Sequence, residues 1–228
     1  DDCSSRGLGD VYKRQTRALL LEGAESVVAI EKDFRAGTVL DPLLAAADGR
    51  LELIEGDALK TPLWDIGTAP RRIIANLPYN IATSLLIQWL EHASAFESMT
   101  LMFQREVAER ITAVPGDSAF GRLSILTGWL ADADILFDIP PEAFVPPPKI
   151  ISSVVQIRPL PEPRVPCDQT ALETVTRLAF GQRRKMLRAS LKSLGGAGML
   201  ENAGIDPRSR PQDLDIAAFC RLAQALDS

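Results

Sequence analysis

Residues 71–80, RRIIANLPYN, hold the side chains in this chain that are best suited to chemistry. An apolar run there predicts a buried strand that ends at Asn76. The Asn76 side-chain oxygen and the Leu77 backbone carbonyl can accept the hydrogens of an amine while its lone pair attacks a methyl group. Pro78 fixes the backbone and removes a competing N–H donor, and Tyr79 offers a flat face for a flipped-out base. This pattern therefore favours a clamp for a nucleobase amine.

A plain structural interpretation of the same stretch stays open. In it, Asn80 caps a helix over residues 81–92 and Tyr79 only packs against neighbouring side chains. The ends of two earlier strands count against this interpretation.

Acidic side chains follow the two strands predicted before residue 71. Glu31 closes VVAIE and can accept hydrogen bonds from both hydroxyls of a ribose, and Asp57 follows LELIEG and can accept from the exocyclic amine of a nucleobase. In an open parallel sheet, ligands bind beyond the carboxyl ends of the strands. With Asn76 at the third strand end, the order acid, acid, amide suggests a cofactor that contains adenosine.

The elements that must position these residues alternate between strands and helices, which predicts a parallel α/β sheet covered on both faces. Apolar runs predict strands at 27–30, 51–54, 73–75, 99–104, 134–139 and 152–159, with helices over 81–92, 105–114 and 119–131 between them. The last two strands are expected to pair antiparallel across the proline-rich loop 140–150.

A linker and a second, helical region follow the sheet. The segment PLPEPRVP at 159–166 holds four prolines and predicts a linker. Helices are expected over 168–180 and 183–194, followed by a glycine-rich break and short helices to the end. Between residues 174 and 200 the chain has no Asp or Glu but several Arg and Lys. This charge run is either a solvated helix face or a phosphate-binding face.

Composition narrows the class of protein. The 228 residues carry a net charge of −5, and no apolar run approaches the ~20 residues of a membrane helix. We expect a cytoplasmic protein without a membrane segment. The three cysteines lack metal-ligand spacing, and His92 is the only histidine. We therefore expect no metal site, no disulfide scaffold and no histidine-based triad.

Taken in order, these motifs resemble the small-subunit (16S) ribosomal RNA adenine dimethyltransferases. The resemblance runs from about Thr16 to the C-terminus, and the segments that carry it are VVAIEKD, LIEGDAL, NLPYNIATSLL, MFQREVAERI, FGRLSIL, FVPPPKIISSVV and FGQRRKMLRASL. It implies a Rossmann-like methyltransferase sheet with a small C-terminal α-helical domain. It also implies that S-adenosylmethionine (SAM) donates methyls to two adjacent adenines near the 3′ end of the RNA during ribosome maturation.

The resemblance also implies roles for individual residues. Glu31 would bind the cofactor ribose, Asp57 its adenine amine, and Asn76 both the cofactor and the reacting amine. Phe144 would stack on the target base opposite Tyr79. Such a site needs no strong general base, because position and desolvation carry most of the reaction.

The basic helix of the second domain would belong to the RNA-binding surface, through Arg183, Arg184, Lys185 and Arg188. The expected partner is small-subunit ribosomal RNA in an immature subunit, and we expect the enzyme to be a monomer.

The start of the chain departs from this family. Residues 1–15, DDCSSRGLGDVYKRQ, contain neither the expected apolar strand nor a convincing glycine-rich loop for the methionine end of the cofactor. We interpret them as a non-native segment, with a methyltransferase domain over 16–158 and a helical RNA-binding domain over 159–228. On this interpretation, catalysis by the chain as given is compromised.

Two alternatives stay open. One is a macrolide-resistance type of enzyme that methylates an adenine of large-subunit RNA on the same fold, although the helical tail with FGQRRKMLR favours the small-subunit enzyme. The other is an RNA-binding assembly or transcription factor without catalysis, against which the intact Asn76, Tyr79 and Phe144 argue.

Overall fold

The structure is a computed structural model that describes residues 14–32 and 35–226, and the side chains of residues 14–32 and 41–226. The described chain divides into two compact units, which we treat separately. The first consists of the described residues up to Ala69 together with Pro141–Lys149, and the second consists of Pro70–Pro140 and Ile150 onward. This division lies inside the segment predicted as the methyltransferase domain, so the boundary at 158/159 stays a prediction. Residues 1–13 lie outside the described chain.

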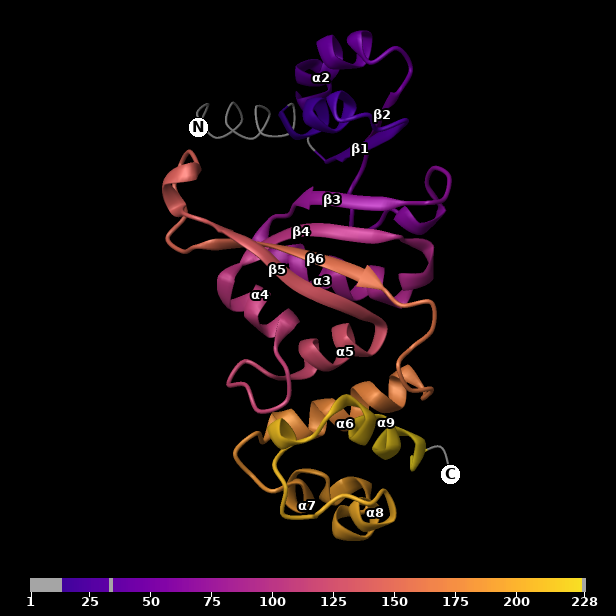
Figure 1. Cartoon of the computed structure of the whole chain (residues 1–228), viewed down its shortest axis with the longest axis vertical. Coiled ribbons are helices and arrows are strands. Elements are labelled where there is room, and N and C mark those ends of the chain that lie inside the picture. Colours follow the sequence, from indigo (N-terminus) through magenta and orange to yellow (C-terminus); the bar gives the residue numbers. More distant parts are fainter. Residues whose placement is uncertain (1–13, 33–34, 227–228) are drawn as a thin grey trace. The chain divides into compact units, whose positions relative to one another are not determined.

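The first unit contains a two-stranded parallel sheet. Strand β1 (Val27–Glu31) pairs in register with β2 (Leu51–Glu55), so that Glu31 lies opposite Glu55. Helix α2 (Arg35–Ala46) connects them, residues 14–21 are also helical, and a 3-10 turn, η1 (Leu63–Asp65), follows β2. The small core is formed by Leu20, Ala47 and Leu51. The parallel pairing of these two strands agrees with the prediction (Figure 1). The expectation of one continuous sheet is not met, because β1 and β2 form a two-stranded sheet separate from the sheet that contains the strand ending at Asn76.

The second unit holds a four-stranded sheet in the order β3-β4-β6-β5. Its strands are β3 (Arg72–Asn76), β4 (Ser98–Gln104), β5 (Ala131–Ile139) and β6 (Ser152–Pro159). β3 and β4 are parallel, whereas β6 runs antiparallel to both β4 and β5. The expected antiparallel pair β5–β6 is confirmed, and the sheet as a whole is mixed because β6 inserts between β4 and β5.

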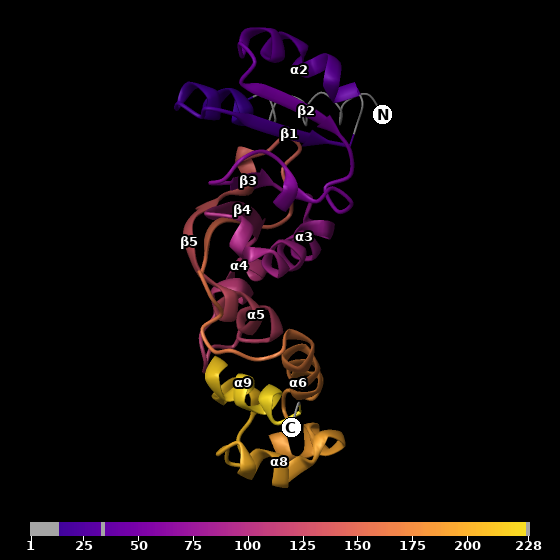
Figure 2. The same cartoon turned by 90° about the vertical axis from the view of Figure 1, so that its right-hand side faces the viewer.

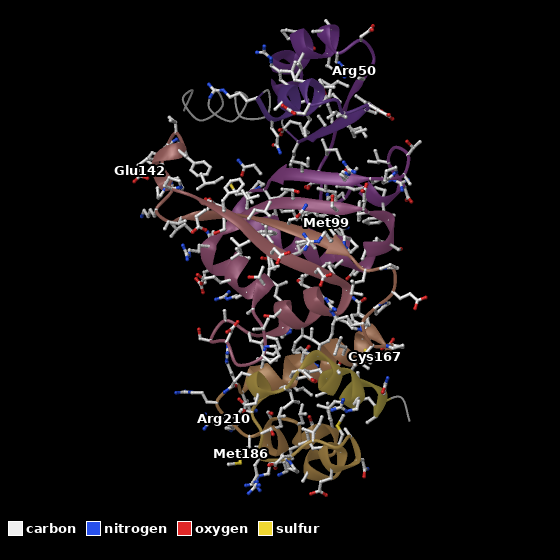
Figure 3. All side chains as sticks on the ribbon, in the orientation of Figure 1. Arg50, Met99, Glu142, Cys167, Met186 and Arg210 are labelled. Carbon is white, nitrogen blue, oxygen red and sulfur yellow. The ribbon has the colours of Figure 1, made fainter. Side chains whose placement is uncertain are left out.

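Helices pack on one face of this sheet (Figures 1 and 2). They are α3 (Tyr79–Glu91), α4 (Arg105–Thr112) and α5 (Arg122–Leu130), with η2 (Ala93–Ala95) between α3 and β4. Met99, Leu101 and Ile157 point to this face and are 0% exposed, and Met99 is labelled in Figure 3. Side chains of the opposite parity, among them Ile74 at 42% exposure, line a hollow of about 390 Å³ on the other face. Coverage of both faces, as expected from the sequence, is therefore not seen in the described part of this unit.

The C-terminal region of the second unit is helical, as predicted. It comprises α6 (Gln169–Gly181), α7 (Leu187–Ser190), η4 (Lys192–Leu194), α8 (Gly196–Asn202), η5 (Pro211–Asp213) and α9 (Ile216–Gln224). The prediction of one helix over 183–194 is wrong, because residues 182–186 are not helical and α7 is one turn long. The glycine-rich break is also wrong in part, since α8 begins at Gly196.

One glycine sets the approach of α9 to α5. A Cβ at Gly128 would lie 2.7 Å from Cδ1 of Ile216. A side chain there would require the end of the Ile216 side chain to move. No helix among the described residues is long and apolar enough to cross a membrane.

Candidate active site

The turn from β3 into α3 explains why the strand can end without a glycine. Pro78 is the N-cap of α3 and has φ −58° and ψ 128°, an extended conformation that needs no left-handed residue. Its carbonyl accepts hydrogen bonds from the backbone N–H groups of Ile81 and Ala82, both at 3.1 Å. The helix therefore begins at Tyr79, two residues earlier than predicted, and Asn80 is not its cap.

Tyr79 is held by a side-chain contact with a distant strand. Its hydroxyl lies 2.6 Å from the hydroxyl of Ser152, the first residue of β6. Ser152 is 0% exposed, whereas Tyr79 is half-buried. The ring is thus attached to the protein at its hydroxyl, and the residue as a whole is partly exposed.

Asn76 and Leu77 stand directly before this turn. Asn76 ends β3 opposite Met102 of β4 and is half-buried, and Leu77 is 8% exposed. The structure thus places Asn76, Leu77, Pro78 and Tyr79 consecutively at the carboxyl end of a parallel strand pair, where ligands of open α/β sheets bind.

In the first unit, Glu31 and Asp57 are brought together at the carboxyl ends of β1 and β2. Lys32 links them, because its backbone N–H donates to Glu31 Oε1 (2.8 Å) and its Nζ donates to Asp57 Oδ2 (2.8 Å). The backbone N–H of Leu59 donates to Asp57 Oδ1 (3.1 Å). Lys32 is not among the residues predicted from the sequence for this site.

These contacts favour the ionised form of Asp57. The hydrogen bond from Lys32 and then that from the Leu59 N–H lower the pKa of the Asp57 carboxyl below its ordinary 3.8. A carboxylate oxygen can accept more than one hydrogen bond, so both oxygens retain acceptor capacity for a ligand. Carboxylates at two neighbouring strand ends fit the hydroxyl and amine donors of an adenosine group.

Phe144 belongs to the loop between β5 and β6. It follows the 3-10 turn η3 (Pro141–Ala143), its backbone N–H donates to the Pro141 carbonyl (3.1 Å), and its side chain is half-buried. Because Phe144 and Tyr79 lie in different units, their stacking on one base stays a prediction.

The predicted RNA-binding residues lie in the non-helical segment after α6 and in α7. Arg184, Lys185 and Arg188 are exposed. Arg183 is more buried: its Nη2 donates to the Asp117 carbonyl (3.2 Å), and its guanidinium lies 6.0 Å from the Phe180 ring centroid. The Arg183 side chain therefore has a hydrogen bond and an aromatic contact within the protein, whereas the Arg188 side chain has the charge of Asp206 near it.

A second loop adds basic residues beside this segment. The backbone N–H of Leu187 donates to the Ser209 carbonyl (2.8 Å), and that of Arg188 to the Pro207 carbonyl (3.1 Å). Exposed Arg210 follows directly, and Figure 3 shows Met186 and Arg210 at the same end of the helical region. Arg210 is 22 residues from Arg188 in the sequence, so only the fold could reveal that they are neighbours.

Comparison with known proteins identifies the family. The sequence matches the family described as "Ribosomal RNA adenine dimethylase" over residues 13–228. The "Ribosomal RNA small subunit methyltransferase A" of Rhodospirillum rubrum is 55% identical over 214 residues, which are 93% of this chain and 74% of the relative. The protein of the same name from Sinorhizobium medicae is 52% identical and covers 92% of this chain and 78% of the relative.

Solved structures give the same assignment. A dimethyladenosine transferase from Plasmodium falciparum has a TM-score of 0.76 and 26% identity over 92% of this chain and 85% of that protein. The 23S rRNA methyltransferase ErmE has a TM-score of 0.66 and 25% identity over 93% of this chain and 86% of its own. The α/β methyltransferase fold is thus confirmed, and the chain belongs to the ribosomal RNA adenine dimethylase family of methyltransferases.

Proposed function

We propose that this chain, when preceded by the strand and glycine-rich loop that the family resemblance implies, catalyses the SAM-dependent dimethylation of two adjacent adenines near the 3′ end of small-subunit ribosomal RNA, in the cytoplasm, during ribosome maturation. The observation that carries the proposal is the difference in similarity between the two kinds of relative. Small-subunit methyltransferases are 52–55% identical to this chain, whereas the large-subunit enzyme ErmE is 25% identical. This difference favours the small-subunit substrate.

The cofactor site would use the acids at the ends of β1 and β2. Glu31 would accept hydrogen bonds from the ribose hydroxyls, and Asp57 from the adenine amine, both as ionised acceptors. SAM supplies a methyl group activated by the positive charge on its sulfur. The contact from Lys32 to Asp57 supports this role, because it keeps the carboxylate charged and oriented at the strand end.

The substrate amine would be held by the end of β3. An aromatic amine is a weak base, so its nitrogen needs correct aim more than it needs a proton acceptor. The Asn76 side-chain oxygen and the Leu77 carbonyl would accept its two hydrogens and turn the lone pair toward the methyl group. As positive charge develops on that nitrogen, both oxygens stabilise it without reorganising. The methyl donor would leave as a neutral thioether, and the methylated nitrogen would release one proton to solvent.

The target base would be held by stacking on Tyr79 and on Phe144. Stacking on an aromatic side chain is worth roughly 1–3 kcal/mol per base and tolerates either face of a purine. Arg184, Lys185 and Arg188, with a smaller contribution from Arg183, would bind phosphates of the subunit and give affinity without reading sequence.

The test is methylation of immature small subunits that lack these methyl groups. The protein, with a family-type strand and glycine-rich loop in place of residues 1–15, is incubated with tritium-labelled SAM and either small or large subunits. The modified nucleotides are located by primer extension. We expect dimethylation of two adjacent adenines in the small-subunit RNA. Methylation confined to large-subunit RNA would instead support the macrolide-resistance alternative, and RNA binding without any methyl transfer would support the assembly-factor alternative.

A further inference from the structure

The contact between Tyr79 and Ser152 joins the start of α3 to the start of β6, 73 residues apart in the sequence. The two hydroxyl oxygens are 2.6 Å apart, at the short end of the range for O–H···O hydrogen bonds. A buried hydroxyl without a partner is costly. Because Ser152 is 0% exposed, breaking its hydrogen bond to Tyr79 would carry this cost.

The position of Ser152 is fixed by the sheet on both sides. It lies opposite Gln104 of β4 and opposite Ile139 of β5. A residue in a strand between two others has little backbone freedom. The hydroxyl of Ser152 is therefore a fixed point against which a side chain on α3 can be oriented.

Further hydrogen bonds strengthen the sheet where β6 begins. Ser153 donates to Asp138 Oδ1 (2.6 Å), and Arg105 donates to the other oxygen of Asp138. The backbone N–H of Arg105 donates to the Ile151 carbonyl (3.0 Å). These contacts join the ends of β4 and β5 to the first residues of β6. The residues on both sides of Ser152 are therefore held by hydrogen bonds to neighbouring segments.

We propose that Ser152 is a positioning residue for methylation, which holds the ring of Tyr79 in the orientation that receives the target base. A tyrosine side chain has two rotatable torsions, and stacking uses one arrangement of them. A bond from its hydroxyl to a buried, fixed partner selects that arrangement before the base arrives, which reduces the ordering cost at binding. Ser152 does not contact the base itself and acts through Tyr79.

This inference rests on the proposed function, and a double-mutant cycle tests it separately. Tyr79→Phe keeps the aromatic face and removes the hydroxyl, and Ser152→Ala removes the partner. A net hydrogen bond of this kind corresponds to a factor of about 3–10. We expect each single variant to lower kcat on immature small subunits by about that factor. KM for SAM should stay unchanged, and the double variant should be no slower than the slower single variant.

A matched control uses another buried serine of the same unit. Ser124 of α5 is 3% exposed, and its hydroxyl donates to the Arg110 carbonyl (2.6 Å). Combining Ser124→Ala with Tyr79→Phe should give multiplicative losses, because the two residues share no described contact.

A second cycle on the free energy of unfolding in urea shows whether the hydrogen bond exists, independently of catalysis. Tyr79→Phe with wild-type kcat would overturn the inference even if Ser152→Ala failed to fold. Multiplicative losses of kcat in the variant that combines Tyr79→Phe with Ser152→Ala would overturn it as well. The urea cycle could show coupling between Tyr79 and Ser152 while the folded wild-type protein methylates no subunit. That result would overturn the proposed function, and the positioning role with it.

Discussion

The basic segment beside α7 gives the sharpest quantitative prediction. Arg184, Lys185 and Arg188 are exposed, whereas Arg183 contacts Asp117 and Phe180. If the three exposed side chains meet phosphates, changing all three to alanine removes three charge contacts. Each lost contact lowers the slope of log affinity against log salt by about 0.7–0.9, so we expect a decrease of about 2.1–2.7. Between 0.1 and 0.3 M salt, wild type should lose roughly tenfold to twentyfold more affinity than the triple variant.

The assay is binding of immature small subunits at several salt concentrations with magnesium held constant. A charge-matched control carries Arg17→Ala, Lys60→Ala and Arg122→Ala, which are also exposed positions. It lowers the net charge equally, so its slope should stay near that of wild type if the surface beside α7 is what binds. Equal slopes for all three proteins, or an equal decrease in both variants, would refute the assignment of this surface.

Arg183 separates structural from RNA contacts. Adding Arg183→Ala to the triple variant should leave the salt slope almost unchanged, because its guanidinium already has protein partners. It should instead lower the free energy of unfolding by about 1 kcal/mol, the scale of one hydrogen bond. A further decrease of about 0.7–0.9 in the slope would place Arg183 on phosphate as well.

Three other predictions concern single sites. Tyr79→Ala and Phe144→Ala should each lower methylation by about 5–150-fold, the equivalent of stacking one base, while SAM affinity measured by calorimetry stays within twofold; equal losses of both would contradict the stacking role. Lys32→Met should destabilise the protein near neutral pH, because the lowered pKa of Asp57 stabilises the fold above the ordinary 3.8. The difference in urea midpoint between wild type and Lys32→Met should vanish as the pH falls below 3.8 and through the lowered pKa of Asp57 in the folded protein. A difference that stays constant with pH would refute the Lys32–Asp57 pair. Burial, and then the hydrogen bond between the Cys220 thiol and Cys167, raise the pKa of Cys220, so iodoacetamide at pH 8 should label Cys167 faster in a peptide map; equal labelling would contradict this burial.

The elements of the sheet could be predicted because each is a local apolar pattern. Residues 152–159 were predicted as a strand with the bounds that β6 has. The pairing of that strand with β4 could not be predicted in the same way, because strand order depends on contacts between distant segments. The sequence therefore predicts the strands and the antiparallel pairing of the last two, but it does not predict the order of the strands in the mixed sheet.

The failure over residues 183–194 has a specific cause. The letters QRRKMLR favour a helix by propensity. In the structure, however, the backbone N–H groups of Leu187 and Arg188 donate to carbonyls of the loop that contains Pro207 and Ser209. A tertiary partner has thus replaced the i−4 partner that a continuous helix would supply. Propensity is a weak prior against such contacts, and the sequence carries no sign of them.

The candidate site shows the same division between local and distant information. Asn76 through Tyr79 could be singled out because the chain changes abruptly from an apolar strand to an amide, a proline and an aromatic ring. The partner of Tyr79 could not, although Ser152 and Ser153 left one signal: they are small polar residues at the start of a strand whose remaining residues are mostly apolar.

The turn after β3 shows how these pieces depend on one another. Because Pro78 is extended and its carbonyl already accepts two N–H groups of α3, the strand can pass into the helix without a left-handed residue. Tyr79 is consequently the first residue of the helix, a position held by the strand on one side and by the helical hydrogen bonds on the other. A glycine in place of Pro78 would permit the same path but would also populate others, since it lacks the restriction on φ. Pro78 therefore restricts the backbone that leads to Tyr79, and Ser152 restricts the Tyr79 side chain. Each reduces the number of conformations that Tyr79 can adopt before a base binds.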